Sequence, residues 1–299
     1  MEPLFILVRI LVFVVGLAIV AYIMTSAIRT FVLPRSAPDM LTRTFFLNMR
    51  RLFNLRMRWT STFLERDGIM AMYAPVCLIM LPAVWLTGVL LGYMCLFWAV
   101  GVQPWSFAFK VSGSSLLTLG FATLDDVPTT IMILSEATIG LILVALLIAY
   151  LPTMYAAFSK REAAVTMLEV RAGSPPSAIE MILRFNRLHR LAQLDEMWVT
   201  WETWFVELEE THTSLAALAF FRSPKPHRSW VTAAGAVLDG ASLVSSTIDV
   251  PPNAQIDLCI RAGYLALRYI SDFFRIPYNP APNATDPISI SRAEYDAAC

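Results

Sequence analysis

Charged residues are scarce in this chain of 299 residues. Asp, Glu, Lys and Arg make up only 15% of it, whereas 57% is hydrophobic, and the apolar residues come in long blocks. A soluble globule of this length needs more charge to cover its surface. The 23 basic residues balance the 23 acidic ones, so no excess of positive charge points to a nucleic-acid partner. The composition therefore indicates a membrane protein.

Cysteine is also rare, and several common functional motifs are missing. The four cysteines show neither a disulfide framework nor a metal-ligand spacing. No glycine-rich phosphate loop follows a predicted strand, which argues against a nucleotide-binding domain. The first apolar run has no arginine at every third position, which argues against a voltage sensor. We expect neither a metal nor a cofactor.

Three apolar runs are long enough to cross the hydrocarbon core of a membrane, which takes about 20 residues. They extend from Leu4 to Leu33, from Ile69 to Val100 and from Pro128 to Phe158. The first run has no small-residue cleavage site at its end, so we expect a retained helix over 1–34 rather than a signal peptide. The sequence predicts an all-α membrane protein with three transmembrane helices.

The segment 35–68, between the first two runs, is strongly basic. It holds seven arginines against Asp39, Glu65 and Asp67. Basic loops favour the cytoplasm, so the N-terminus is expected outside and the C-terminus in the cytoplasm. Apolar residues at near-helical spacing predict an amphipathic helix along the inner leaflet, in contact with membrane lipids. An ordinary basic loop is the alternative.

A shorter apolar stretch, 103–127, separates the second and third runs. It is too short to span, and irregular backbone at membrane depth is tolerated only where it is buried in protein or lines water. The sequence therefore predicts a re-entrant half-helix and loop. Together with an outer helix and an inner helix at 128–158, it makes a predicted pore domain over 69–162.

A five-residue motif lies in this stretch. Its sequence, Thr118-Leu119-Gly120-Phe121-Ala122, resembles the TVGYG selectivity filter of potassium channels. In that family four chains converge, and filter carbonyls replace the water around a dehydrated cation. The resemblance covers roughly residues 69–162. It implies a homotetramer that conducts potassium or other monovalent cations across a plasma membrane, such as a bacterial inner membrane.

The motif also departs from that pattern. Ala122 replaces the second glycine, and Phe121 lacks the usual hydroxyl. If residue 122 adopts a positive φ, its methyl group costs about 1 kcal/mol per chain, which leaves the ion preference open. Asp125 and Asp126 follow, and they form either an acidic ring at the outer mouth or ordinary solvated loop acids.

The third apolar run contains an acidic residue. Glu136 should face water, the filter or a partner, because a carboxylate at membrane depth costs roughly 2–3 kcal/mol; a position near the outer interface is the alternative. Its spacing to Gly140 resembles the inner helix of prokaryotic inward-rectifier-like channels, which implies a hinge at Gly140. Pro152 predicts a kink that sets the width of the gate.

Beyond a break at Gly173 the chain becomes polar. Four helices are predicted there, at 178–193, 195–221, 230–247 and 254–274, within a helical cytoplasmic domain over 163–276. A flexible tail over 277–299 follows. Glu209 and His212 lie one helical turn apart and could bind a metal, but no second Glu-x-x-His element accompanies them.

These observations lead us to expect a tetrameric cation channel, with potassium as the leading candidate ion, gated through the helical domain, and not an enzyme. Two alternatives stay open. One is a non-conducting, pore-loop-like membrane scaffold or sensor, which Ala122 favours. The other is a membrane-anchored metal-dependent enzyme built on Glu209 and His212.

Overall fold

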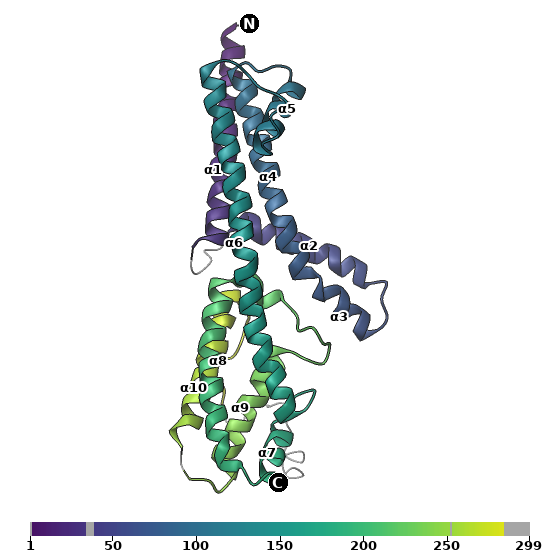
Figure 1. Cartoon of the computed structure of the whole chain (residues 1–299), viewed down its shortest axis with the longest axis vertical. Coiled ribbons are helices and arrows are strands. Elements are labelled where there is room, and N and C mark those ends of the chain that lie inside the picture. Colours follow the sequence, from purple (N-terminus) through teal and green to yellow (C-terminus); the bar gives the residue numbers. More distant parts are fainter. Residues whose placement is uncertain (1, 34–38, 252, 284–299) are drawn as a thin grey trace. The chain divides into compact units, whose positions relative to one another are not determined.

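The computed structural model describes residues 2–33, 39–251 and 253–283. Within this part of the chain every regular element is a helix (Figure 1). The chain divides into two compact units, Met1–Ala156 and Ala157–Cys299. The second unit begins six residues before the predicted boundary at 163.

Three helices are long and apolar enough to cross a membrane, and they confirm the three predicted spans. The first is α1 (Glu2–Phe31). The second is α4 (Tyr73–Val100), which follows the short helix α3 (Phe63–Ala71) almost directly. The third is α6 (Val127–Ala172). The chain therefore has the helices of a multi-pass membrane protein.

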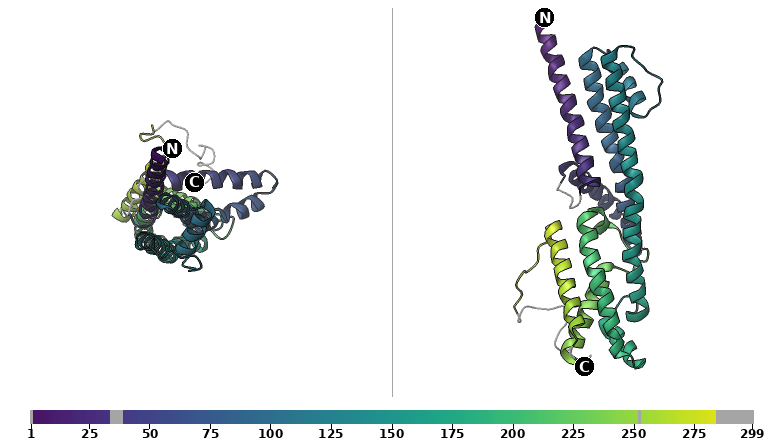
Figure 2. Two further views of the ribbon diagram at one scale, coloured as in Figure 1. Left: turned by 90° about the horizontal axis from the view of Figure 1, so that it is seen from above. Right: turned by 60° about the vertical axis from the view of Figure 1, so that its left-hand side comes forward.

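Helices α1 and α4 lie side by side in close contact (Figure 2). A Cβ atom added to Gly92 would lie only 2.6 Å from Val20 Cγ2, and one added to Gly16 would lie 2.7 Å from the Gly92 carbonyl oxygen. Gly88 and Gly92 form a G-x-x-x-G motif, whose small residues let two membrane helices approach closely. This motif is visible in the sequence, although the apolar runs alone did not indicate the pairing.

The basic segment forms two helices instead of one. Helix α2 (Met40–Met57) is capped by Asp39, whose side chain accepts a hydrogen bond from the Thr42 amide at 2.8 Å. Asp39 also accepts from Ser26 Oγ at 2.6 Å, and Ser26 Oγ in turn accepts from Trp85 Nε1 at 3.1 Å. This chain of bonds fixes the start of α2 beside α1 and α4. Residues 34–38 lie outside the described part of the chain.

Helix α6 is longer than the inner helix predicted at 128–158. Its 46 residues correspond to about 69 Å at 1.5 Å per residue, roughly twice the hydrocarbon thickness. The charged residues after Phe158 are good helix formers, and no helix-breaking residue appears before Gly173. The predicted break at Gly173 is confirmed, because this residue has φ 81° directly after the last helical residue.

The second unit contains the remaining helices. They are α7 (Ala178–Arg187), α8 (Leu194–Ser214), α9 (Trp230–Thr247) and α10 (Ala254–Phe274), with two 3₁₀ turns at Leu191–Gln193 and Ala216–Phe220. The bounds predicted for α9 and α10 are confirmed. The helices predicted at 178–193 and 195–221 end earlier, and each is followed by a 3₁₀ turn. Of the predicted tail 277–299, residues 277–283 form no helix and the others lie outside the described residues.

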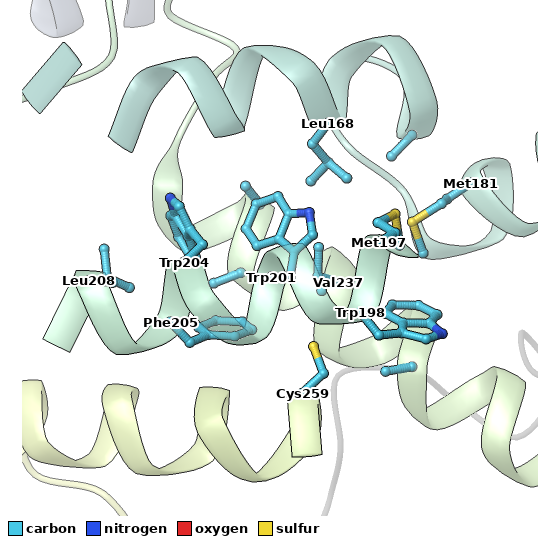
Figure 3. Packing of buried hydrophobic residues seen from close by; sticks show 14 of the residues in the cluster. Leu168, Met181, Met197, Trp198, Trp201, Trp204, Phe205, Leu208, Val237 and Cys259 are labelled. Carbon is cyan, nitrogen blue, oxygen red and sulfur yellow. The ribbon is translucent and has the colours of Figure 1, made fainter. Parts of the chain in front are cut away.

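Tryptophans of α8 form the core of the second unit (Figure 3). Trp201 and Trp204 contact each other with ring centroids 4.5 Å apart, and Phe205 lies against both rings. A Cβ atom on Gly263 of α10 would lie 3.0 Å from the Phe205 ring, so the two helices pack closely there. The recurrence of tryptophan at every third position thus serves packing within the unit.

Candidate functional site

The motif lies in the loop that follows helix α5 (Trp105–Leu116). Hydroxyl groups attach α5 to its neighbours: Ser112 Oγ lies 3.0 Å from the Leu90 carbonyl oxygen of α4, and Ser115 Oγ donates to the Ile133 carbonyl oxygen of α6 at 2.6 Å. Both serines are buried. Helix α5 therefore lies beside α4, as Figure 1 shows, and its Ser115 hydroxyl also bonds it to α6.

Backbone amides of the motif point back to the end of α5. The Thr118 amide donates to the Ser115 carbonyl oxygen at 2.9 Å, and the Leu119 amide donates to the Ser114 carbonyl oxygen at 2.8 Å. The Ala122 amide donates to Ser114 Oγ at 3.1 Å. Ser114 thus holds Leu119 and Ala122 through two different oxygens.

The carbonyl groups of the motif, unlike most of its amides, have no hydrogen-bond partner among the described residues. In the described part of the chain, no residue donates a hydrogen bond to the carbonyl oxygens of residues 118–121. All four of these residues are exposed. Backbone carbonyls are strong acceptors that normally find a partner. Among the described residues these four carbonyls have no donor, so they are free to accept from water.

Two residues of the motif have a positive φ. Gly120 has φ 72°, which glycine adopts without strain, and Thr118 has φ 53°. Ala122 is not among the positive-φ residues, so the expectation of backbone strain at residue 122 is wrong. The Ala122 amide donates to Ser114 Oγ at 3.1 Å, so the segment is held there without a left-handed residue.

Glu136 faces α5. It is fully buried, and its Oε1 atom accepts a hydrogen bond from Ser112 Oγ at 2.5 Å. Its Oε2 atom has no hydrogen-bond partner among the described residues. The single hydroxyl proton of Ser112 serves either Glu136 or the Leu90 carbonyl, not both at once. A carboxylate with so few donors is costly to bury.

Gly140 lies one turn further along α6 and contacts the end of α5. A Cβ atom there would lie 2.3 Å from the Leu116 carbonyl oxygen. Close approach of the two backbones therefore explains this glycine without a hinge. Helix α6 also continues through Pro152, so the chain shows no helix break at either residue. The hinge and the gate remain predictions.

The two acids after the motif, Asp125 and Asp126, are both exposed but differ in their hydrogen bonds. Asp126 precedes α6, where it accepts hydrogen bonds from the Thr129 amide at 3.2 Å and from Thr129 Oγ1 at 2.6 Å. These bonds hold the pKa of Asp126 below its usual range. Asp126 thus acts as a helix cap. The acidic ring at the outer mouth, expected of Asp125 and Asp126, stays a prediction.

His212, in the second unit, is fully buried. Its Nδ1 atom donates to the Leu208 carbonyl oxygen at 2.9 Å, and its Nε2 atom lies 3.3 Å from Arg161 Nη1, which donates to it. Burial, together with the charge of Arg161, lowers the pKa of His212 to about 4. Both ring nitrogens are engaged within the protein. Among the described residues, no three His, Cys, Asp or Glu side chains are grouped as metal ligands.

Arg161 is a buried, hydrogen-bonded charge that the sequence analysis did not identify. In the sequence it directly follows Lys160 just beyond the third apolar run, and in the structure it is buried in the second unit. It donates to the carbonyl oxygens of Leu218 at 3.1 Å and Phe221 at 2.8 Å, and it pairs with Glu162 at 2.9 Å. The buried residues 161, 165, 168 and 172 share one helix face. That spacing is the signal that could have revealed it.

No family model matches the chain, and neither the curated proteins nor the solved structures include one that is significantly similar to it.

Proposed function

We propose that the chain is one subunit of a homotetrameric potassium channel of the plasma membrane. In this proposal, α5 is a re-entrant half-helix and residues 118–122 form the selectivity filter. The N-terminus lies outside, and the helical second unit acts in the cytoplasm as the gating module.

The observation that carries this proposal is the row of carbonyl oxygens at residues 118–121. Within the described ranges no residue donates to them, whereas most amides of the same segment donate to Ser114 or Ser115. Carbonyl oxygens in rings can replace the hydration shell of a potassium ion. Four copies around an axis would supply such rings.

Exposed apolar side chains next to these carbonyls support assembly. Leu117 is 53% exposed, Leu119 is 60% exposed and Phe121 is 65% exposed. Exposed apolar groups gathered on one loop are typical of an interaction surface. In the proposed tetramer, neighbouring subunits cover these three side chains.

Potassium flux into liposomes tests the proposal, with Gly120→Ala as the critical variant. Since Gly120 has φ 72°, an added methyl group strains the segment, and the flux should fall at least about tenfold. Gly113→Ala is the matched control, because its nearest contact would be the Leu90 Cδ1 atom at 3.9 Å. A wild-type protein without potassium flux, or a Gly120→Ala variant with wild-type flux, would contradict the proposal.

A further inference from the structure

Helix α2 has three distinct faces along its length. One face is partly buried and packs toward the start of α4, where Tyr73 Oη donates to the Phe46 carbonyl oxygen at 2.9 Å. The ring of Phe53 contacts that of Tyr73 at a centroid distance of 5.5 Å. These contacts hold α2 at the end of a membrane-spanning helix. Most residues of the other two faces are exposed.

The second face is basic. Arg43, Arg50, Arg51 and Arg58 fall on it by helical spacing, and all four are exposed. Arg51 donates to Asn48 Oδ1 at 3.3 Å. Among the described residues, none of the four arginines forms a salt bridge with a carboxylate. Within the described ranges no carboxylate therefore pairs with the positive charge of this face.

The third face is apolar and equally exposed. Leu52 is 64% exposed and Leu55 is 54% exposed, and Trp59, just beyond the helix end, is 81% exposed. The spacing of three and four residues places them on one side of the helix axis. Adjacent basic and apolar faces on one helix are the pattern of a segment that lies in a membrane interface, where tryptophan is enriched.

We propose that α2 binds anionic phospholipids, with the arginines of its basic face against headgroup phosphates and Leu52, Leu55 and Trp59 among the upper acyl chains. Charge complementarity identifies the lipid class: neutral headgroups would leave four like charges side by side without counter-charges. Each arginine near an anionic surface contributes about 1 kcal/mol, which corresponds to roughly fivefold enrichment. This proposal requires a membrane protein but not a channel.

Fluorescence quenching of Trp59 tests it in the full-length chain. The protein is reconstituted into phosphatidylcholine vesicles that contain either brominated phosphatidylglycerol or brominated phosphatidylcholine at equal mole fraction. Subtracting the signal of a Trp59→Phe variant isolates Trp59 from the other tryptophans. We expect the anionic lipid to quench Trp59 at least about fivefold more effectively than the neutral one. Equal quenching by the two lipids would overturn the proposal.

Charge variants sharpen the test. Replacing Arg43, Arg50 and Arg51 together by Gln should abolish the anionic excess, whereas replacing them by Lys should preserve it, because the interaction is electrostatic. The matched control replaces three exposed arginines of the second unit, Arg187, Arg190 and Arg275, by Gln. Loss of the excess in that control would contradict the assignment to α2.

Salt dependence keeps the proposal falsifiable if the Gln variant does not fold. Added salt screens exposed charges, so the anionic excess at the wild-type Trp59 should fall as ionic strength rises. An excess that does not change with salt would mean that the headgroup charge is not what α2 binds.

Discussion

At the scale of single residues, Ser114 holds the 118–122 segment through two different oxygens. Its carbonyl oxygen accepts from the Leu119 amide, and its hydroxyl accepts from the Ala122 amide. Any residue at position 114 would supply the backbone carbonyl, but the bond to the Ala122 amide needs the serine hydroxyl. In the described part of the chain, most amides of the segment are bonded in this way, and its carbonyls at 118–121 have no donor.

Ala122→Gly should change little. Ala122 does not have a positive φ, so removal of its methyl group relieves no left-handed strain. We expect the potassium-to-sodium permeability ratio, measured as a bi-ionic reversal potential, to stay within about twofold of the wild-type value. A large gain in potassium preference would show that residue 122 adopts a different backbone conformation in the conducting protein.

Acid should destabilise the second unit through His212. Its pKa is lowered to about 4, against 6.5 for an unperturbed histidine, so the unfolded chain takes up the proton first. The contribution to stability is complete above about pH 6.5 and is lost as the pH falls toward 4, by up to about 3 kcal/mol. Hydrogen exchange of the second unit between pH 7 and pH 4 measures this loss.

The matched variants for this titration are His212→Gln and His189→Gln. The first removes the buried imidazole and should flatten the dependence of the unfolding free energy on pH. The second removes an exposed histidine and should leave the dependence as it is. An unchanged slope in His212→Gln would assign the acid effect to other groups.

At the scale of elements, the contact between α5 and α6 depends on Gly140. In Gly140→Ala the new Cβ would meet the Leu116 carbonyl oxygen at 2.3 Å, and a backbone atom cannot move aside as a side chain can. Overpacking of this kind costs about 1–3 kcal/mol, so the thermal unfolding midpoint in detergent should fall.

Gly113→Ala is the control for this element contact as well. Its added methyl group would meet only Leu90 Cδ1, at 3.9 Å, and replacing glycine by alanine within a helix stabilises it by about 0.5–1 kcal/mol. The unfolding midpoint of this variant should hold or rise. Equal losses in both variants would mean that α5 is not seated on α6 at Gly140.

Helices were predictable from the sequence where local signals agree. The spans follow from apolar runs, and α9 and α10 begin directly after Ser229 and Asn253, whose side chains accept from backbone amides two residues later. The end of α6 was not predictable in this way, because Lys160 and Arg161 resemble a membrane exit. Which side of that helix is buried depends on segments that come much later in the chain.

The candidate site was predictable in outline but not in detail. The sequence shows the motif at 118–122 and its place between two apolar runs, and it shows that Glu136 lies within an apolar run. It does not show which residues contact these groups. Ser112, Ser114 and Ser115 are small polar residues in a helix, and only packing decides which of them meets Glu136 and which meets the loop.

At the scale of the whole molecule, α6 contributes to both compact units, since the division falls at Ala156 within this helix. The apolar runs predicted the membrane-spanning helices of the first unit. The more polar composition after Gly173 predicted a separate helical domain. The boundary was predicted six residues too late, at 163, because helix propensity does not change where the division falls.

Cation binding in the assembled protein tests the central claim most directly. Crystals of the full-length chain grown in rubidium, a heavier analogue of potassium, would reveal bound cations by anomalous scattering. We predict four chains around an axis, with rubidium on that axis and coordinated by the carbonyl oxygens of residues 118–121. An assembly in which these carbonyls face lipid, or in which rubidium is absent from them, would contradict the account.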